Sequence, residues 1–408
     1  MAGQDDVVDS EQQQPLLVTP AAAGRKFSEP QDEDEAEEEE EEEEQHVVCE
    51  TSRRERVVAY LCFLILGATV LLPWNLLIVI TPYFSFRLRD SPFSSSAASW
   101  TPFVFTCGNF AFLIQATRTQ KQEGFKNIKR RLLASISSLA SIIVLLWMTA
   151  QVDALSPLAF FLLVMVISLA GSAISAVLQS ASAALASIFD DPSLMQGVMS
   201  GQGAIGFAVA ITQFFAALRA DKTEEADHSN DTSDKLVRST ATFFVISFLF
   251  TVFAFFSALV LVRLPMYKHT VHLAQDADEA HRTQTSLAAV HRKIQHLGSA
   301  MAFVFIVTIG LFPGITSSIQ STSRDSPLSS EGADAHAHIA NSSRFFTNGY
   351  ICSLLMMSGM TAPALLPEEA DIASSIMLLY LTGGLAMGAA LSFVRGINGV
   401  GVAARALG

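Results

Sequence analysis

Nine apolar stretches constrain the fold of this 408-residue chain more than any other feature. Each is close to the ~20 residues that a helix needs to cross a bilayer. Lipid offers no partner to an unpaired backbone group, so we expect each stretch to be helical and the chain to be an all-α, polytopic membrane protein. The predicted spans cover residues 57–80, 98–117, 132–152, 157–180, 195–218, 240–264, 298–320, 345–366 and 372–395.

Charge is scarce and unevenly placed along the chain. Charged residues make up 16% of it, against about 25% in soluble domains. Residues 31–44, almost wholly Asp and Glu, supply most of the net charge of −13, and we expect residues 1–56 to be a disordered acidic tail. We predict a first six-helix bundle at 57–264, a cytoplasmic loop at 265–297 and a second bundle at 298–408.

Basic residues predict the orientation of the spans. Lys and Arg concentrate before the first span, between the second and third, and between the sixth and seventh. These segments share one side if the spans alternate, and an excess of positive charge marks that side as cytoplasmic. The acidic tail is then cytoplasmic, and two sequons, at Asn230 and Asn341, fall on the opposite side as candidate N-glycan sites.

Inside the predicted spans, ionisable side chains occur only at the edges. Charged residues at membrane depth usually mark ion paths or proton relays, so their absence disfavours a proton pump, a cation channel and a carrier of charged solutes. Carboxamides both donate and accept hydrogen bonds, which suits an uncharged polar solute such as a nucleobase or a sugar. The neutral hydrogen-bonding residues of the spans are Asn75, Asn109, Gln115, Gln179, Gln202, Gln213, Asn348 and Tyr350.

The first span contains Pro73, Trp74 and Asn75, none of which belongs in a segment that only fills lipid. Proline removes a backbone donor and leaves the carbonyl of Thr69 without its helical partner. Such a segment must face protein or a wet cavity. Trp74 either anchors the helix at the membrane interface, as membrane tryptophans usually do, or stacks on the planar ring of a solute.

In the fourth span, Gly171, Ser175, Gln179 and Ala183 recur every four residues and therefore share one helix face. A face of small residues lets another helix or a ligand approach closely. Two interpretations of Gln179 stay open: it contacts a ligand, or it only hydrogen-bonds a neighbouring helix, as amides in spans often do.

Residues 201–206, Gly-Gln-Gly-Ala-Ile-Gly, have the spacing of a dinucleotide-binding loop. That loop needs a preceding strand and a water-exposed helix start, whereas this one lies inside an apolar segment. We therefore interpret Gly197 and Gly201 as a helix-packing pair, and Gly384 and Gly388 as a similar pair. The sequence has no metal-ligand spacing, phosphate loop or nucleophile elbow, so we predict neither an enzyme nor a cofactor.

Six short motifs, in order along the chain, resemble those of the equilibrative nucleoside transporter family. Each motif alone is modest, but six in the right order are specific. They are Leu72-Pro73-Trp74-Asn75, Leu178-Gln179-Ser180, Met199-Ser200-Gly201-Gln202-Gly203, Thr308 with Phe312-Pro313, Thr347-Asn348-Gly349-Tyr350, and Leu381 with Gly384-Leu385 and Gly388.

The resemblance implies eleven spans in two bundles of major-facilitator type around a central cavity, with alternating access and no obligatory ion. It also implies that Trp74 and Gln179 bind a nucleoside and that Asn75 shapes the same region. We assign further cavity or gating positions to Pro73, Gln202, Gly203, Pro313 and Asn348.

The second half of the chain departs from that family. Only 34 residues separate Pro313 from Asn348, too few for two more spans of ~20 residues with their loops. The family's eighth and ninth spans, with the Asp and Arg expected to hold the ribose, then have no counterpart, and the second bundle at 298–408 is predicted to be incomplete.

We predict facilitated transport of nucleosides, with nucleobases as a further class, by two bundles that rock around a site near the midplane. Two alternatives stay open: a facilitator of another neutral solute such as a sugar, and a truncated membrane protein that does not transport. Glu11 ahead of Leu16-Leu17 resembles an acidic dileucine sorting signal. The plasma membrane and a vacuolar or lysosomal membrane are both candidate locations.

Overall fold

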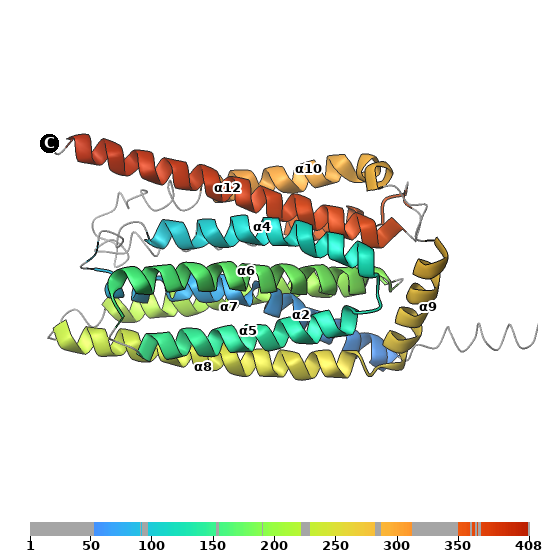
Figure 1. The fold of residues 1–408 in the computed structure, drawn as a ribbon, viewed down its shortest axis with the longest axis horizontal. Coiled ribbons are helices and arrows are strands. Elements are labelled where there is room, and N and C mark those ends of the chain that lie inside the picture. Colours follow the sequence, from blue (N-terminus) through green and yellow to red (C-terminus); the bar gives the residue numbers. More distant parts are fainter. Residues whose placement is uncertain are drawn as a thin grey trace, which may run out of the picture. The chain divides into compact units, whose positions relative to one another are not determined.

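A computed structural model shows the chain as a set of long α-helices (Figure 1), with no β-strand among the residues that it describes. All of these residues belong to the unit from Ser52 to Gly408. They are residues 53–89, 91, 97–151, 155–189, 191–221, 229–281, 287–311, 350–359, 361–363, 365 and 369–406. The all-α prediction is confirmed. The acidic tail before Arg53 and the sequon at Asn341 lie outside the described residues. The other sequon residue, Asn230, lies in the first turn of α8 (Ser229–Leu261).

Most of the described helices lie close to the predicted spans. The seventh prediction, 298–320, is displaced, because α10 begins at Leu287, inside the predicted loop at 265–297, and its described part ends at Leu311. A further short apolar helix covers Tyr350–Gly359. The others are α2 (Arg53–Val79), α3 (Thr81–Arg87), α4 (Ala97–Glu123), α5 (Ile128–Gln151), α6 (Pro157–Ser187), α7 (Pro192–Asp221), α8 (Ser229–Leu261), α9 (Pro265–His281), α10 (Leu287–Leu311) and α12 (Ala370–Ala406).

Six helices in the described part of the chain are long and apolar enough to cross a membrane, which confirms a polytopic membrane protein. They are α2, α5, α6 and the segments Thr240–Leu261, Ala288–Gly310 and Ile372–Val394. α4 and α7 occupy the second and fifth predicted spans but are not among the six, and the eighth predicted span is described only as the short helix over Tyr350–Gly359. The total of nine spans therefore stays a prediction.

Two helices were not expected from the sequence. α3 begins beside Pro82 and α9 begins at Pro265, and proline fits the first turn of a helix because its missing donor would have no partner there. α9 lies within the predicted cytoplasmic loop. Tyr267 and Val271, one turn apart on α9, are buried in the larger of two hydrophobic clusters, so this polar segment is held by a narrow apolar edge.

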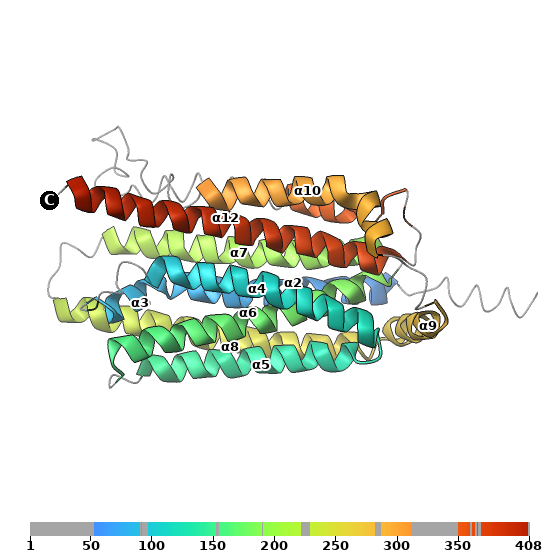
Figure 2. The same cartoon turned by 45° about the horizontal axis from the view of Figure 1, so that its top comes forward.

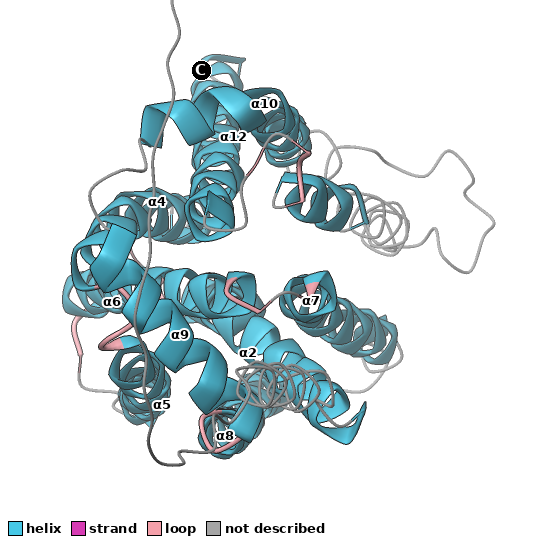
Figure 3. Cartoon of the chain, turned by 90° about the vertical axis from the view of Figure 1, so that its right-hand side faces the viewer, coloured by secondary structure: helices cyan, strands magenta, loops and turns pink. Residues whose placement is uncertain are grey.

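α2 is in contact with several helices, among them α4, α6, α7 and α8, which positions the residues of interest. It packs against α6, α7 and α8, as the view along the helices shows (Figure 3). α5 packs against α6 and α8, while α10 pairs with α12. Figure 2 shows α4 lying alongside α12, with which it is in contact.

Glycines bring α2 and α7 into backbone contact. A methyl group added to Gly67 would overlap the carbonyl oxygen of Val198, and one added to Gly201 would overlap that of Leu64. At Gly197 it would come within 3.1 Å of the Tyr60 carbonyl oxygen. The helix-packing interpretation of Gly197 and Gly201 is confirmed.

The second predicted glycine pair plays the same part between α10 and α12. A methyl group on Gly384 would lie 2.6 Å from the carbonyl oxygen of Ala302, and one on Gly388 would lie 3.0 Å from that of Phe305. Distances of this kind leave room only for hydrogen, so these two helices also approach as closely as their backbones allow.

Candidate functional site

Pro73 lies buried inside α2, which continues through it as one helix. Its nitrogen cannot donate to the carbonyl of Thr69. On the facing helix, a methyl group on Gly171 would lie 3.8 Å from Pro73 and 3.8 Å from the ring of Phe105. The glycine of α6 therefore sits where the proline of α2 and a ring of α4 come together.

Trp74, the next residue, is half-buried and packs against a ring from another helix. Its ring centroid lies 5.5 Å from that of Phe105 on α4, with the planes tilted by 47°. Phe105 is itself buried. Trp74 therefore packs against the smaller hydrophobic cluster, which contains Phe105, and its role at a site stays a prediction.

Asn75 is buried and engages its own helix. Its Nδ2 donates to the carbonyl oxygen of Leu71 at 3.0 Å, one turn earlier in α2. A donor of the amide is thus paired within α2, as buried polar groups usually are.

The predicted face of α6 does point at α2. The hydroxyl of Ser175 donates to the carbonyl oxygen of Val70 at 2.7 Å, one turn along from the contact of Gly171 with Pro73. One further turn along this face, the helical rise puts Gln179 level with Leu66 and Gly67. Gln179 is 4% exposed and makes no hydrogen bond with another described residue.

Gln202 lies on α7, near the same level of α2. Gly201, its neighbour on α7, lies against the backbone of Leu64 and Ala68. The Nε2 atom of Gln202 is buried without a hydrogen-bond partner in the described part of the chain. Gly203 is exposed, and nothing described lies within 4 Å of a methyl group built on it.

The predicted residues therefore lie along the contacts of α2 with α6 and α7, a region called the seam below, but they do not form one cluster. By the helical rise, Gln179 lies near the level of Gly67, and Gln202 follows the glycine of α7 that contacts α2. Trp74 and Asn75 follow Pro73, near the level of Gly171. Eight residues of α6 separate Gly171 from Gln179, which is about 12 Å along the axis. Pro313 and Asn348 lie outside the described residues.

Three further residues of α4 bear on the site: two were named from the sequence and one was not. Asn109 donates from Nδ2 to the carbonyl oxygen of Ser172 at 3.2 Å, a bond that ties α4 to α6, while Gln115 is exposed. Phe105, the ring partner of Trp74, was not predicted, because it is one of several aromatic residues in that span and no local pattern distinguishes it.

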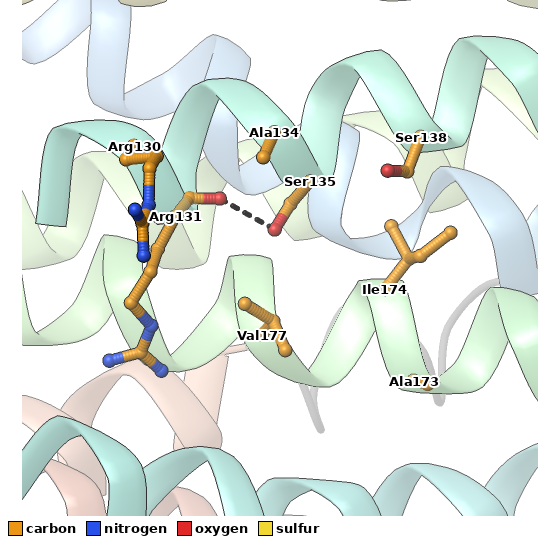
Figure 4. Close-up of a pocket in the computed structure, with 8 residues that line it drawn as sticks. All are labelled: Arg130, Arg131, Ala134, Ser135, Ser138, Ala173, Ile174 and Val177. Atoms are coloured by element: carbon orange, nitrogen blue, oxygen red, sulfur yellow. Dashed lines mark hydrogen bonds between the residues drawn. The ribbon is translucent and has the colours of Figure 1, made fainter. Parts of the chain in front are cut away.

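The seam holds neutral groups. Among the residues that the structure describes, no three His, Cys, Asp or Glu side chains come together as a metal site. A separate cavity of about 330 Å³ lies between α5 and α6 (Figure 4), and its lining includes neither Trp74 nor the two amides.

Known proteins are similar in sequence to most of this chain. The chain is 24% identical to equilibrative nucleoside transporter 1 of Rattus norvegicus over 471 residues, which cover 82% of this chain and 96% of the relative. It is 22% identical to equilibrative nucleoside transporter 1 of Mus musculus over 463 residues, with the same shares. Both alignments are longer than the 408-residue chain, so parts of each relative lie opposite gaps in it. No protein-family model matches the chain.

Proposed function

We propose that this chain, a distant homologue of the equilibrative nucleoside transporters and a polytopic membrane protein, carries nucleosides across a membrane by facilitated transport. Homology to transporters also bears out the prediction that the chain is not an enzyme. Nucleobases are a further substrate class under this proposal. Rocking of two helix bundles around the substrate would supply alternating access.

The observation that carries the proposal is the pair of amides beside α2. Leaving a buried polar group unpaired costs about 1–3 kcal/mol, and Gln202 holds its Nε2 in that state while Gln179 makes no bond with a described residue. A nucleobase offers donors and acceptors that match two carboxamides. A bound substrate would therefore supply the partners that the described part of the protein does not.

Trp74 and Asn75 would form a second substrate-binding position on the same path. The indole face can stack on a base, and its contact with Phe105 holds the ring in place. The two amides and the Trp74–Asn75 pair are separated by about 12 Å along the helix axis. A nucleoside would therefore contact them one after the other as it passes α2. Pro73, Gly203, Pro313 and Asn348 remain proposed cavity or gating positions.

The test is uptake of radiolabelled uridine into vesicles that contain the 408-residue chain. The variant Trp74→Ala with Gln179→Ala is compared with a matched control, Trp147→Ala with Gln115→Ala, in which the same residue types are exposed on α5 and α4. We expect saturable uptake that the first variant loses and the control keeps. Equal uptake by both variants would contradict the proposed site. Competition by glucose as strong as that by unlabelled uridine would instead favour a sugar facilitator.

A second candidate is a truncated membrane protein that does not transport. The alignments, longer than the chain itself, favour it, because they leave parts of each relative without a counterpart. Under this alternative, well-folded protein gives no uptake, and transcripts carry an in-frame insertion between codons 320 and 345 that restores the carrier.

The proposal leaves two membranes as locations, the plasma membrane and a vacuolar or lysosomal one. Fluorescently tagged protein, with and without alanine at Leu16 and Leu17, distinguishes them. Enzymatic removal of N-glycans tests Asn230 and Asn341, which the proposed orientation puts outside the cytoplasm.

A further inference from the structure

The cavity between α5 and α6 is a groove at the end where α5 begins (Figure 4). Its volume of about 330 Å³ falls within the range of about 300–1,000 Å³ that is typical of ligand clefts. Its lining is Arg130, Arg131, Ala134, Ser135, Ser138, Ala173, Ile174 and Val177.

Small side chains hollow out this groove on a surface that faces lipid. On α6, the exposed residues Leu158, Leu162, Val166 and Leu169 recur every three or four positions, and Ala173 comes next in the same row. An apolar row of this exposure on a membrane-spanning helix is the row that contacts lipid chains. Ala173 faces the small residues Ala134, Ser135 and Ser138 of α5, and their small size leaves a notch between the two helices.

One end of the groove carries an uncommitted positive charge. Arg130 is exposed and makes no hydrogen bond or ion pair with another described residue. Arg131 beside it is engaged, since its guanidinium donates to Oε1 of Gln120 and, at 3.0 Å, to the carbonyl oxygen of Ala116. Figure 4 shows both arginines at the same end of the groove.

The surroundings add to this charge. Lys126 and Lys129 are exposed just before Arg130, and none of the described residues that line the groove is acidic. By the distribution of Lys and Arg, this end of α5 lies at the cytoplasmic face, where anionic lipids concentrate and attract basic residues.

We propose that the groove holds one anionic phospholipid, with an acyl chain in the notch between α5 and α6 and the lipid phosphate on Arg130. A zwitterionic lipid also has a phosphate, but its own ammonium group offsets that charge, so a lipid of net negative charge balances Arg130 better. A free anion would leave the apolar part of the groove empty. This inference does not depend on the transported substrate.

The test uses the full chain purified in detergent, with lipid binding counted by native mass spectrometry. Dioleoyl phosphatidylserine and dioleoyl phosphatidylcholine are titrated separately. We expect phosphatidylserine to bind more tightly, and Arg130→Gln to reduce that preference about fivefold, the effect of one basic residue at a membrane surface. Lys268→Gln on α9 removes the same charge from an exposed site outside the groove and is expected to keep the preference.

A second pair of variants tests the notch itself. Ala173→Leu fills the groove and is expected to lower occupancy by both lipids, while Ser137→Leu, exposed on α5 but outside the lining, is expected to leave it unchanged. The proposal would be overturned if the two lipids bound equally well and Ala173→Leu abolished the binding of both. The groove would then hold an acyl chain or a detergent molecule without regard to headgroup charge. Equal loss in Arg130→Gln and Lys268→Gln would overturn it as general charge attraction.

Discussion

The ring of Phe103 on α4 stacks on the ring of Phe393 on α12, with centroids 4.7 Å apart and planes 16° apart. Trp100 meets Phe393 edge-on, with centroids 4.8 Å apart. Further along, the ring of Phe110 lies against Gly383 of α12. α4 belongs to the predicted first bundle and α12 to the second, so this aromatic cluster joins the two.

Replacing both members of the Phe103–Phe393 stack by alanine is expected to cost less than the sum of the two single changes. Stacked rings contribute about 1 kcal/mol beyond the area they bury, and a double-mutant cycle isolates that share. Unfolding in mixed detergent micelles measures it. A cycle of Phe103→Ala with Phe303→Ala, a 67% exposed ring on α10, should show no coupling. Additive losses at Phe103 and Phe393 would contradict the stack.

Gly201→Ala is expected to destabilise the protein by about 1–3 kcal/mol, because its methyl group would overlap the backbone of α2. Gly203→Ala, two residues on, is the matched control. Open space surrounds it, and alanine is favoured over glycine in a helix by up to about 1 kcal/mol. Thermal unfolding of the two variants should therefore move in opposite directions, and a common direction would refute the α2–α7 contact.

Gln202→Met is expected to raise stability by about 1–3 kcal/mol while it lowers uridine uptake. The change removes a buried donor that lacks a partner in the described residues and keeps the length of the side chain. Thermal unfolding without substrate and uptake in vesicles measure the two effects. Gln115→Met, on an exposed position of α4, should alter neither. A less stable Gln202→Met protein would show that the amide has a partner within the chain.

Burial raises the pKa of Tyr267, on α9, to about 12 from its usual value of 10.0. The folded protein then favours the neutral phenol, so this stabilisation is complete below pH 10 and is lost as the pH rises towards 12. Tyr267→Phe removes the group that ionises. We expect the melting temperature of the parent protein to fall between pH 9 and pH 11 by more than that of Tyr267→Phe. Tyr350→Phe, at a 68% exposed position, should behave like the parent.

The packing faces of individual helices could be predicted from the sequence. The four-residue spacing of Gly171, Ser175 and Gln179 identified the face of α6 that meets α2, and Ser175 bonds to α2 from it. The spacing of Gly197 and Gly201 likewise identified a close helix contact. Both patterns are local, because a helix fixes which of its own residues share a face.

The relative heights of residues on different helices could not be predicted in this way. Motif resemblance assigns Trp74 and Gln179 to one site, yet the structure separates their levels by about two turns of α6. Loops and packing between helices set that offset, and spacing within one segment carries no information on it. The same holds for the contact of Trp74 with Phe105 on α4. α9 escaped prediction because its sequence is mostly polar. Its apolar edge is narrow: Tyr267 and Val271 are buried in the larger cluster, and Met266 and Ala274 are partly buried against it.

The glycines of α2 and α7 also bear on how this molecule can move. Main chain lies on main chain there, so a slide or roll of either helix would bring the larger neighbouring side chains into collision. We therefore expect the two helices to move together. Where α4 meets α12, the contacts at Phe393 are made by rings, which can separate or rotate while both helices keep their own hydrogen bonds. A change of shape that opens one side of the protein and closes the other would therefore take place at the aromatic junction, with α2 and α7 travelling together.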